Sequence, residues 1–528
     1  MGGLSADAAR EAATDADIEL KLDTALLRAV PAGRATAIFC LGSCFHRRQP
    51  IDRLEIVVDG RTHRPTAFRM PRLDLFRDLH PTFGVEGSGS VSRDADSDAD
   101  PEVRCYRSGF WATIPLEATA RCGEIEVSVR ALLADGRNAS AALGRIEVAE
   151  PTAPPSYEGA AGRGGDELIA ICMATFEPDP DLFRVQIESL RAQRDANWIC
   201  LISDDCSGPS HFETIEGTVK GDPRFVVSRS DGHLGFYRNF ERALEMVPAE
   251  AGLVALCDQD DRWYPDKLEV LRRSIGPGQL AYSDTRLVDA DGRVLAGSLW
   301  ERRRNNYTNF ASMLIANTVP GAASLMRREV VDLALPFPEA PGDLFHDHWL
   351  GLVAMATGEL SYVDLPLYDY VQHPHAVQGK MVVEDDVRRE KAGGWQRRRL
   401  RALRDFFSGW RAAYFLGYVT LKVQAEVLLL RCSSRLTPRK RRALTRIVAS
   451  ERSPLSFAWL AARPLRALFG RAETLGAEEH LAKGILWRHI VALRTRRRER
   501  PGGSTHDSSL PPPGSFNQKR LRRWRALR

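Results

Sequence analysis

The sequence predicts a protein of several domains: an N-terminal β-sandwich, a central α/β domain with a Rossmann-like sheet, and a C-terminal helical region. Three observations lead to this prediction. Short runs of alternating polarity fill residues 31–150, strand-like and helical runs alternate over 166–380, and arginine-rich helical patterns follow residue 380. At 528 residues the chain is also too long for a single hydrophobic core.

Composition sets the boundaries between these parts. The stretch "EPTAPPSYEGAAGRGG" is rich in Pro and Gly, which is typical of a linker. The predicted segments are a weakly structured leader at 1–30, a β-sandwich accessory domain at 31–150, a linker at 151–165, the α/β domain at 166–380, a basic helical region at 381–500 and a disordered basic tail at 501–528.

The β-sandwich is predicted from strands that end in turn signals. "RLEIVVDG" and "EIEVSVRALLADGR" alternate apolar and polar residues. Asp-Gly, which is typical of a tight turn, stands at or near the end of each. "RSGFWATIPL" is better explained as a core strand than as a sugar-binding platform. Carbohydrate binding and docking both remain open as roles for this domain.

In the central segment, polar side chains stand where successive apolar runs end. Thr175 ends "ELIAICMAT", Asp204 and Asp205 end "WICLISDD", the acidic stretch 258–261 ends "LVALCDQDD", and Asp284 ends "LAYSD". A single Asp in such a place is commonly a helix N-cap. Four in succession instead predict a binding site, because ligands of parallel sheets with helices on both faces bind beyond the carboxyl ends of the strands.

The stretch "LCDQDDRW" places three carboxylates, Asp258, Asp260 and Asp261, within four positions. Like charges this close repel each other unless a positive group lies among them. Oxygen ligands in a tight turn suit Mg²⁺ or Mn²⁺, which commonly bridge to substrate phosphates. We therefore expect the positive partner to be a divalent cation bound to a diphosphate.

The order of these motifs resembles that of family-2 glycosyltransferases, the inverting GT-A-type enzymes that use nucleotide sugars. The resemblance covers roughly residues 166–380. "HDHW" and "QH" most resemble the rhamnosyltransferase-like branch, which builds bacterial surface polysaccharides. The matching blocks are "ATFEPD", "LISDDCSGP", "GHLGFYRNFERAL", "LCDQDDRWYPDKLE", "AYSDTRLVDADGRV", "VPGAASLMRR", "FHDHWLGLVAMATG" and "YDYVQHPHAVQG".

The resemblance implies a reaction and a donor site. A hexosyltransferase of this kind moves a sugar, with rhamnose as one candidate, from a nucleotide diphosphate to a hydroxyl of a cell-surface glycan or lipid-linked acceptor. Thr175 and the pair Asp204 and Asp205 would hold the base and ribose. Arg238 would face the diphosphate, although a solvated helix arginine is an equally good explanation. Asp258 would point to the ribose, as the first carboxylate of an Asp-x-Asp motif.

The resemblance also implies the metal site and the catalytic base. Asp260 and His373 would bind the metal, and His375 competes with His373 for that role. Asp347 matches the position of the base that accepts the proton of the acceptor hydroxyl. His346 stands where many relatives carry Glu, so its role is open. Gly321 would let the backbone approach a sugar.

Two tryptophans in these motifs are candidates for stacking on sugars. Trp263 follows the acidic turn, and Trp349 ends "HDHW". For Trp349, packing in the core is the better explanation.

Two other classes of function are compatible with parts of the sequence. A metal-dependent phosphohydrolase would also use clustered Asp and His, but would need more ligands at metal spacing than "DQDD" and "HDH" provide. A catalytically silent carbohydrate-binding protein would not need Asp258, Asp260 and Asp347 together. Nucleic acid is not expected as a partner, because the basic region contains no recognised motif.

Charge and cysteine content suggest where the protein works. Residues 381–528 hold 34 Lys and Arg against 12 Asp and Glu, a net charge of +22, so the first 380 residues carry −17 of the total +5. The N-terminus has no signal-peptide pattern, and the nine cysteines form no Cys-x-x-Cys pair. The apolar run at 410–432 is broken by charges and predicts a buried or interfacial helix. We expect a cytoplasmic protein held by its basic C-terminal region on the anionic inner face of the plasma membrane.

Overall fold

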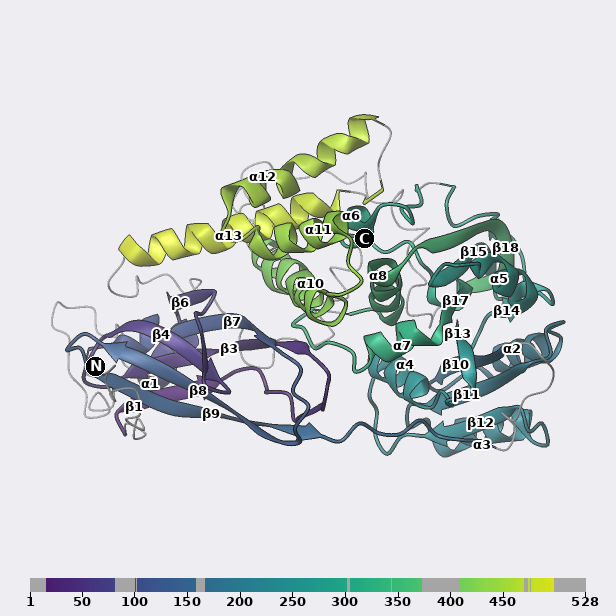
Figure 1. Cartoon of the computed structure of the whole chain (residues 1–528), viewed down its shortest axis with the longest axis horizontal. Coiled ribbons are helices and arrows are strands. Elements are labelled where there is room, and N and C mark those ends of the chain that lie inside the picture. The colour runs from purple at the N-terminus through teal and green to yellow at the C-terminus, as the bar shows by residue number, and fades with distance from the viewer. Residues whose placement is uncertain are drawn as a thin grey trace, which may run out of the picture.

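The computed structural model describes residues 16–80, 100, 102–157, 167–301, 304–342, 344–372, 409–469, 473–474 and 476–497. Two β-sheets at the N-terminal end stand beside a helix-flanked sheet formed by the middle of the chain (Figure 1). The C-terminal helices lie across both and fill the space between them (Figure 1).

The N-terminal part contains two sheets, with strand orders β1-β3-β7-β6 and β2-β9-β8-β4-β5. Both contribute to one hydrophobic cluster, which includes Ile38, Phe110 and Val129. The predicted leader at 1–30 contains β1 and β2, so part of it is strand and not weakly structured. The elements are β1 Ile18–Leu22, β2 Ala29–Pro31, β3 Thr36–His46, β4 Ile51–Val58, β5 Arg61–His63, β6 Ala67–Met70, α1 Leu73–Leu79, η2 Arg104–Arg107, β7 Gly109–Leu116, β8 Gly123–Leu133 and β9 Asn138–Ala149.

The central part is an α/β domain, as the sequence predicts. Its sheet has the order β12-β11-β10-β13-β17-β15-β18-β14, with β16 paired to β15. The elements are β10 Leu168–Thr175, α2 Pro180–Arg191, β11 Trp198–Asp204, α3 Pro209–Val219, β12 Phe225–Arg229, α4 Phe236–Glu245, β13 Ala251–Cys257, β14 Arg262–Trp263, α5 Lys267–Ile275, β15 Leu280–Asp289, β16 Val294–Ala296, α6 Phe310–Met313, η4 Gly321–Ala323, β17 Ser324–Arg327, α7 Arg328–Ala334, α8 His346–Thr357 and β18 Leu360–Gln372.

Two sequence-based expectations about this sheet are wrong in detail. The sheet is mixed, because β17 runs antiparallel between β13 and β15. A four-residue strand of this kind has too short a pattern to be seen in the sequence. Asp284 also does not end a strand, since β15 continues to Asp289 and only its register shifts at Asp284.

Local sequence explains how the first strands reach the edge where ligands bind. β11 is buried along its whole length, as expected for a central parallel strand. α2 begins at Asp179, whose carboxylate accepts hydrogen bonds from the N–H groups of Asp181 and Leu182. Parallel pairing places Thr175 of β10 beside Asp204 of β11, so their polar side chains meet at one end of the sheet.

The C-terminal region is helical where the structure describes it, as predicted, whereas residues 381–408 and the predicted tail at 501–528 lie outside the described residues. Its elements are η5 Ala413–Val419, which is a π-helical segment, α10 Thr420–Arg431, α11 Pro438–Ala449, α12 Pro454–Ala462, η6 Arg463–Phe469 and α13 Ala477–Arg497. Among the described residues, one helix, Gly409–Arg431, is long and apolar enough to cross a membrane. However, 72% of its most apolar window is buried inside the molecule. Of the two predictions for this segment, a buried helix is therefore right and an interfacial helix is wrong.

This helix joins the other two parts into one core. The indole N–H of Trp111 in β7 donates a hydrogen bond of 2.9 Å to the Tyr414 hydroxyl. The guanidinium of Arg431 donates to the carbonyls of Ala35, at 2.7 Å, and of Ala334, at 2.8 Å. Trp111 is 1% exposed, so "RSGFWATIPL" is a core strand as predicted.

Candidate functional site

The acidic turn, residues 258–261, directly follows β13 in the middle of the sheet. Gln259 holds this turn against the end of β10: its side chain accepts a hydrogen bond of 2.8 Å from the N–H of Phe176 and donates one of 3.3 Å to the Phe176 carbonyl. Asp261 is fully buried, and its Oδ1 accepts a long bond of 3.4 Å from the N–H of Val371 in β18. The turn is thus fixed at three strand ends.

Burial and mutual repulsion disfavour the ionised form of Asp258 and Asp261 in the acidic turn. Burial, and then the charges of Asp260 and Asp347, raise the pKa of Asp258 to about 7. Burial, followed by the charges of Asp258 and Asp260, raises the pKa of Asp261 well above its usual value. The Oδ2 atom of Asp261 is buried, and no hydrogen-bond partner for it occurs in the described part of the chain. A divalent cation fits this set, because it prefers oxygen ligands and would offset the repulsion.

A buried lysine, Lys267, stands beside the turn and was missed in the sequence. Its Nζ lies 3.3 Å from the centroid of the Trp263 ring and 4.5 Å from that of Tyr368, and it donates a hydrogen bond to the Ala322 carbonyl. Burial lowers its pKa to about 7, and the charges of Cys257 and Asp261 act in the opposite direction. The acidic turn therefore has an internal positive neighbour. The signal in the sequence was its place six residues after Asp261, at the first residue of the next helix.

Asp347 lies in the first turn of α8, close to the acidic turn. Its carboxylate accepts a hydrogen bond of 2.6 Å from the N–H of His348 and is also bonded to the Asn317 side chain and the backbone of Gly321. Burial raises the pKa of Asp347 to about 7, and these hydrogen bonds oppose the shift. The carboxyl group thus sits in a fixed position, with a pKa near neutrality.

Gly321 allows α8 to approach the turn before β17. A Cβ atom at this position would lie 2.9 Å from His346 Nε2 and 3.4 Å from the Cβ of Asp347. His346 cannot easily move, because its ring stacks on Phe240 with centroids 3.6 Å apart. Burial lowers the pKa of His346 to about 3, so the imidazole is neutral. The close approach that the structure provides at Gly321 is thus to His346, and the approach of a sugar stays a prediction.

The predicted nucleotide ligands take part in internal hydrogen bonds. Asp204 accepts bonds from the Thr175 hydroxyl, at 3.2 Å, and from the backbone N–H of Ser207, at 2.9 Å. Asp205 accepts bonds from the N–H groups of Leu234, at 2.5 Å, and Gly235, at 2.8 Å. These residues shape the edge of the sheet, and their contacts to a base or ribose stay predictions.

Arg238 is not among the residues that surround the acidic turn. Its guanidinium pairs with Glu241 on its own helix and, at 2.8 Å, with Glu339. It lines a cavity of about 120 Å³ together with Val30, Thr36 and other residues of the N-terminal part. Arg238 is therefore ion-paired and not simply solvated, and its contact with a diphosphate stays a prediction.

Four further residues singled out in the sequence remain to be placed, two histidines and two tryptophans. His373 and His375 lie outside the described residues, so the second predicted metal ligand has no structural description. Trp263 is 2% exposed, and Trp349 is fully buried with its indole N–H bonded to the Ala334 carbonyl at 3.0 Å. Neither tryptophan can stack on a sugar in this arrangement, so that expectation is wrong for Trp263.

Among the described residues, the group of His, Cys and Asp atoms that lies at metal-binding spacing is in the N-terminal part and not at the acidic turn. Ligand atoms of His80, Asp100 and Cys105 lie within 4.8 Å of one another. Asp100 already accepts hydrogen bonds from the N–H groups of Arg104, at 2.7 Å, and Cys105, at 2.9 Å. This carboxylate therefore has a structural task in holding the η2 turn.

Comparison with known proteins agrees with the geometry of the central domain. A family model described as glycosyl transferase family 2 matches residues 170–333. The uncharacterized protein y4gI of Sinorhizobium fredii is 33% identical over 127 residues, covering 24% of this chain and 13% of that protein. The putative teichuronic acid biosynthesis glycosyltransferase TuaG of Bacillus subtilis is 27% identical over 180 residues, covering 33% of this chain and 67% of that protein.

Solved structures of glycosyltransferases also resemble the chain. S. aureus TarS 1-349 in complex with UDP-GlcNAc aligns with a TM-score of 0.35 and 15% identity, over 62% of this chain and 92% of that one. Mannosyltransferase PcManGT from Pyrobaculum calidifontis, with GDP-Man and Mn2+, gives 0.34 and 12%, over 66% and 90%. Both TM-scores are below 0.5, so the superpositions are loose. The family model therefore covers the part of the chain that holds the acidic turn and ends before Asp347.

Proposed function

We propose that the protein is a metal-dependent, inverting glycosyltransferase. It would move a hexose from a nucleotide diphosphate donor to a hydroxyl of a glycan or lipid-linked acceptor, with rhamnose as one candidate sugar. The observation that carries the proposal is the juxtaposition of the acidic turn with Asp347, whose charge contributes to the raised pKa of Asp258. A leaving diphosphate and an attacking hydroxyl need groups of these two kinds close together.

The acidic turn would hold Mn²⁺ or Mg²⁺. Asp260 and Asp258 are the proposed ligands at its open side, and the unpartnered Oδ2 of Asp261 supports a cation in this position. When bound, the cation stabilises the negative charge that develops on the departing diphosphate. Lys267, which is held by its bond to the Ala322 carbonyl, would offset part of the charge of Asp258 and Asp261.

Asp347 would act as the general base. Its hydrogen bonds to His348 and Gly321 orient the carboxylate, and a pKa near 7 allows it to take a proton from the acceptor hydroxyl. As the hydroxyl oxygen attacks the anomeric carbon, its proton passes to the Asp347 carboxylate and the bond to the diphosphate breaks. Attack from the face opposite the leaving group inverts the configuration.

The relatives support biosynthesis as the setting. TuaG is described as a putative teichuronic acid biosynthesis glycosyltransferase. We propose a comparable role in making a bacterial cell-surface glycan, in the cytoplasm and on the inner face of the plasma membrane. We further propose that the two N-terminal sheets form a β-sandwich accessory domain, which the shared cluster of buried residues between them supports.

A panel of nucleotide sugars tests the proposal. Each donor is added to the full chain with and without Mn²⁺, and Tm is measured, since a ligand that binds the folded state raises Tm by mass action. The donor that binds is then incubated with candidate acceptors, and glycoside formation is followed by mass spectrometry. Release of free sugar at the same rate with and without acceptor would indicate a phosphohydrolase. Binding of a sugar without turnover in the presence of Mn²⁺ would indicate a silent carbohydrate-binding protein.

A further inference from the structure

The top of the molecule carries apolar side chains that nothing covers. In α12 only Leu460 is buried, and in η6 only Arg463. The exposed fractions are 84% for Leu455, 58% for Leu465, 79% for Leu468 and 80% for Phe469. Large exposed apolar side chains gathered in one short segment mark an interaction surface, whereas single ones are ordinary.

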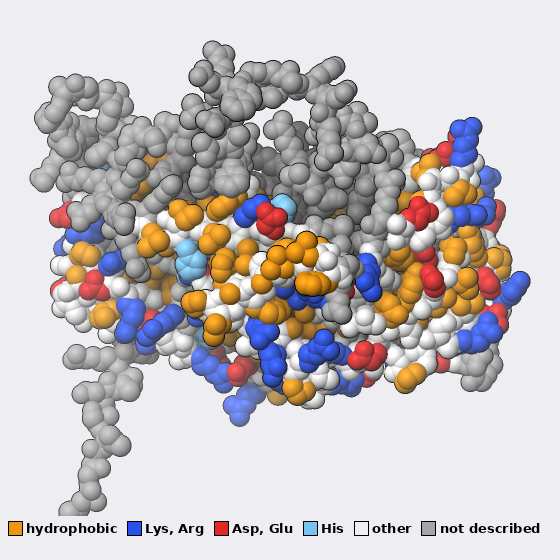
Figure 2. Space-filling model, turned by 90° about the horizontal axis from the view of Figure 1, so that it is seen from above, with side chains coloured by type: hydrophobic (Ala, Val, Ile, Leu, Met, Phe, Trp, Pro, Cys, Tyr) orange, Lys and Arg blue, Asp and Glu red, His pale blue; other side chains and the backbone are white. Residues whose placement is uncertain are grey.

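This segment forms an outer edge of the molecule. α12 and η6 rise above the helices that pack on the central domain, away from both groups of sheets (Figure 1). Seen from that side, hydrophobic side chains gather beside a row of Lys and Arg (Figure 2). We call α11, α12 and η6, residues 438–469, the top surface.

The positive charge of the top surface lies mainly on the arginines of α11, because Lys440, Arg463 and Arg466 are paired with Glu359, Glu478 and Glu473 from outside the segment. Residues 438–469 contain eight Lys and Arg and one acidic residue, Glu451. Glu451 is 2% exposed and is paired with Lys422, at 3.2 Å, and with Arg488, at 3.1 Å. It therefore does not neutralise the exposed arginines.

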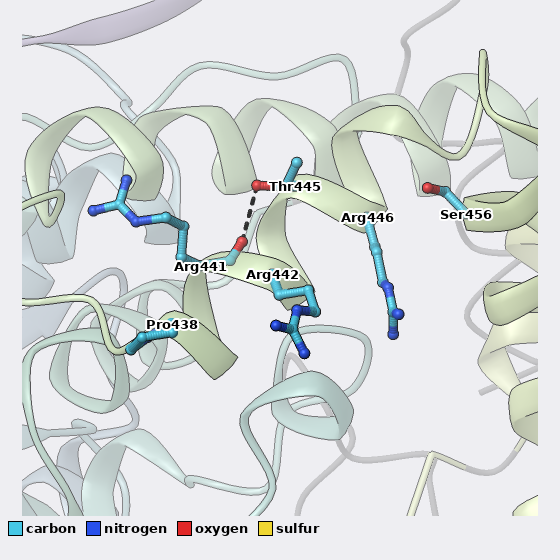
Figure 3. Close-up of a pocket in the computed structure, with 6 residues that line it drawn as sticks. All are labelled: Pro438, Arg441, Arg442, Thr445, Arg446 and Ser456. Atoms are coloured by element: carbon cyan, nitrogen blue, oxygen red, sulfur yellow. Dashed lines mark hydrogen bonds between the residues drawn. The ribbon is translucent and has the colours of Figure 1, made fainter.

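Three of these arginines line an open cavity between α11 and α12. Arg441 and Arg442 come from one turn of α11 and Arg446 from the next, and with Ser456 of α12 they line a volume of about 330 Å³ (Figure 3). Thr445, between them, has its hydroxyl bonded to the Arg441 carbonyl at 3.0 Å. Guanidinium groups in this arrangement suit phosphate oxygens.

We propose that the top surface binds an anionic lipid bilayer, with the apolar side chains of α12 and η6 inserted and the arginines of α11 on the headgroups. Helices with apolar side chains beside Lys and Arg bind at the interface in this way. The inference rests on the proposed location at the membrane and narrows the contact to residues 438–469. The apolar segment 410–432 is buried and offers no such surface, whereas residues 438–469 carry exposed apolar side chains.

Other occupants fit less well. The C-terminal segment 498–528 holds eight Lys and Arg against two acidic residues, so it would be repelled by the top surface. The same surface of a second copy would be repelled for the same reason. Nucleic acid would match the charge but would leave Leu455, Leu468 and Phe469 without apolar contact. Only an anionic bilayer supplies both phosphate and hydrocarbon.

The top surface is also connected to the candidate site. Arg463 and Arg466 of η6 donate hydrogen bonds of 2.9 and 3.3 Å to the Ser312 hydroxyl in α6. The next residue, Met313, accepts a bond of 2.8 Å at its carbonyl from His348, the neighbour of Asp347. Docking through η6 would therefore hold the proposed base at a fixed short distance from the bilayer, which suits a lipid-linked acceptor.

Vesicle co-sedimentation tests the proposal with the full chain. Wild type is mixed with vesicles of phosphatidylglycerol and phosphatidylcholine, or of phosphatidylcholine alone, at low and high salt. We expect binding to the anionic vesicles only, weakened by salt. Leu468→Ser with Phe469→Ser should lower the partition coefficient at least tenfold, about 1.4 kcal/mol. Arg439→Glu with Arg442→Glu should also lower it at least tenfold, because each such charge contributes about fivefold.

Matched variants elsewhere on the surface serve as controls. Leu365→Ser removes a leucine that is 57% exposed on β18, and Arg184→Glu reverses an exposed charge on α2. Both should bind vesicles as wild type does. If they weaken binding as much as the top-surface variants, or if phosphatidylcholine alone binds equally, the proposal is overturned. Binding to RNA that survives Leu468→Ser with Phe469→Ser, without binding to vesicles, would identify a nucleic-acid surface instead.

Sedimentation does not depend on catalysis, so the two proposals fail separately. If wild type does not bind anionic vesicles but turns over the donor in detergent, the lipid contact is overturned and the proposed glycosyltransferase activity stands. Vesicle binding without donor turnover would overturn the proposed function and retain the lipid contact.

Discussion

Replacing Gly321 by Ala tests whether the turn before β17 sets the position of the proposed base. The new Cβ would lie 2.9 Å from His346 Nε2. An ordinary contact between such atoms is about 3.5 Å, so a shift of roughly 0.6 Å is needed. His346 is held by Phe240, with ring centroids 3.6 Å apart, so the first turn of α8 must move and carry Asp347 with it.

Two magnitudes follow from this shift. Overpacking a tight core site costs about 1–3 kcal/mol of the free energy of unfolding. A misplacement of about 1 Å at a catalytic group can lower the rate about 10²-fold, so a shift of half that size should lower kcat on the order of tenfold. The KM for the donor should change little, because the acidic turn lies on another strand.

The assay combines urea denaturation with steady-state kinetics. Gly217→Ala is the control, since Gly217 lies within α3 and nothing lies within 4 Å of the added Cβ. That variant should be at least as stable as wild type, because Ala favours a helix. If Gly321→Ala matches Gly217→Ala in both stability and kcat, the tight approach of α8 is not what positions Asp347.

The other predictions concern the metal, the base, pH and the shared core. Asp260→Ala should abolish Mn²⁺-dependent donor binding, read as Tm with and without donor, while the fold persists; full turnover in the presence of EDTA would contradict it. Asp347→Asn should keep the donor Kd but lower single-turnover transfer about 10²–10⁴-fold, and a loss of only a few-fold would place the base elsewhere. Mn²⁺ affinity, followed by calorimetry, should increase as pH rises through about 7, because the proton on Asp258 must leave before metal binds. Without metal the sign for stability is opposite: the raised pKa values of Asp258 and Asp347 favour the folded state at acid pH, and this contribution is lost as pH rises through about 7. Tyr414→Phe should cost about 1–3 kcal/mol in urea denaturation, because Trp111 and Glu451 lose a buried hydrogen-bond partner; an unchanged midpoint would show that water replaces the hydroxyl.

The central domain could be predicted because its signals are local. Buried strands such as β11 appear as continuous apolar runs, and Asp258 to Asp261 follow such a run directly. The helical character of the C-terminal region was readable for the same reason. Asp347 could be assigned only through resemblance, since no spacing along the chain connects it to the acidic turn.

The features that escaped prediction depend on how distant elements pack. Lys267 is one lysine among many charged helix residues until α5 turns it into the core beside Trp263. Arg238 points to Glu339 and the N-terminal part because of the orientation of α4, which its sequence does not determine. The segment 410–432 could be recognised as apolar, but which surfaces would bury it could not be read from its own residues.

The position of the Gly409–Arg431 helix has a consequence for biosynthesis. It fills the space between the N-terminal sheets and the central domain, yet it is made after both. At roughly 5–20 residues per second, the stretch from residue 149, where β9 ends, to residue 431 takes on the order of tens of seconds to translate. During that time Trp111 and the apolar side chains around it have no cover on the ribosome-bound chain. We therefore expect chaperone dependence in the cell, and aggregation of nascent chains that stop before this helix.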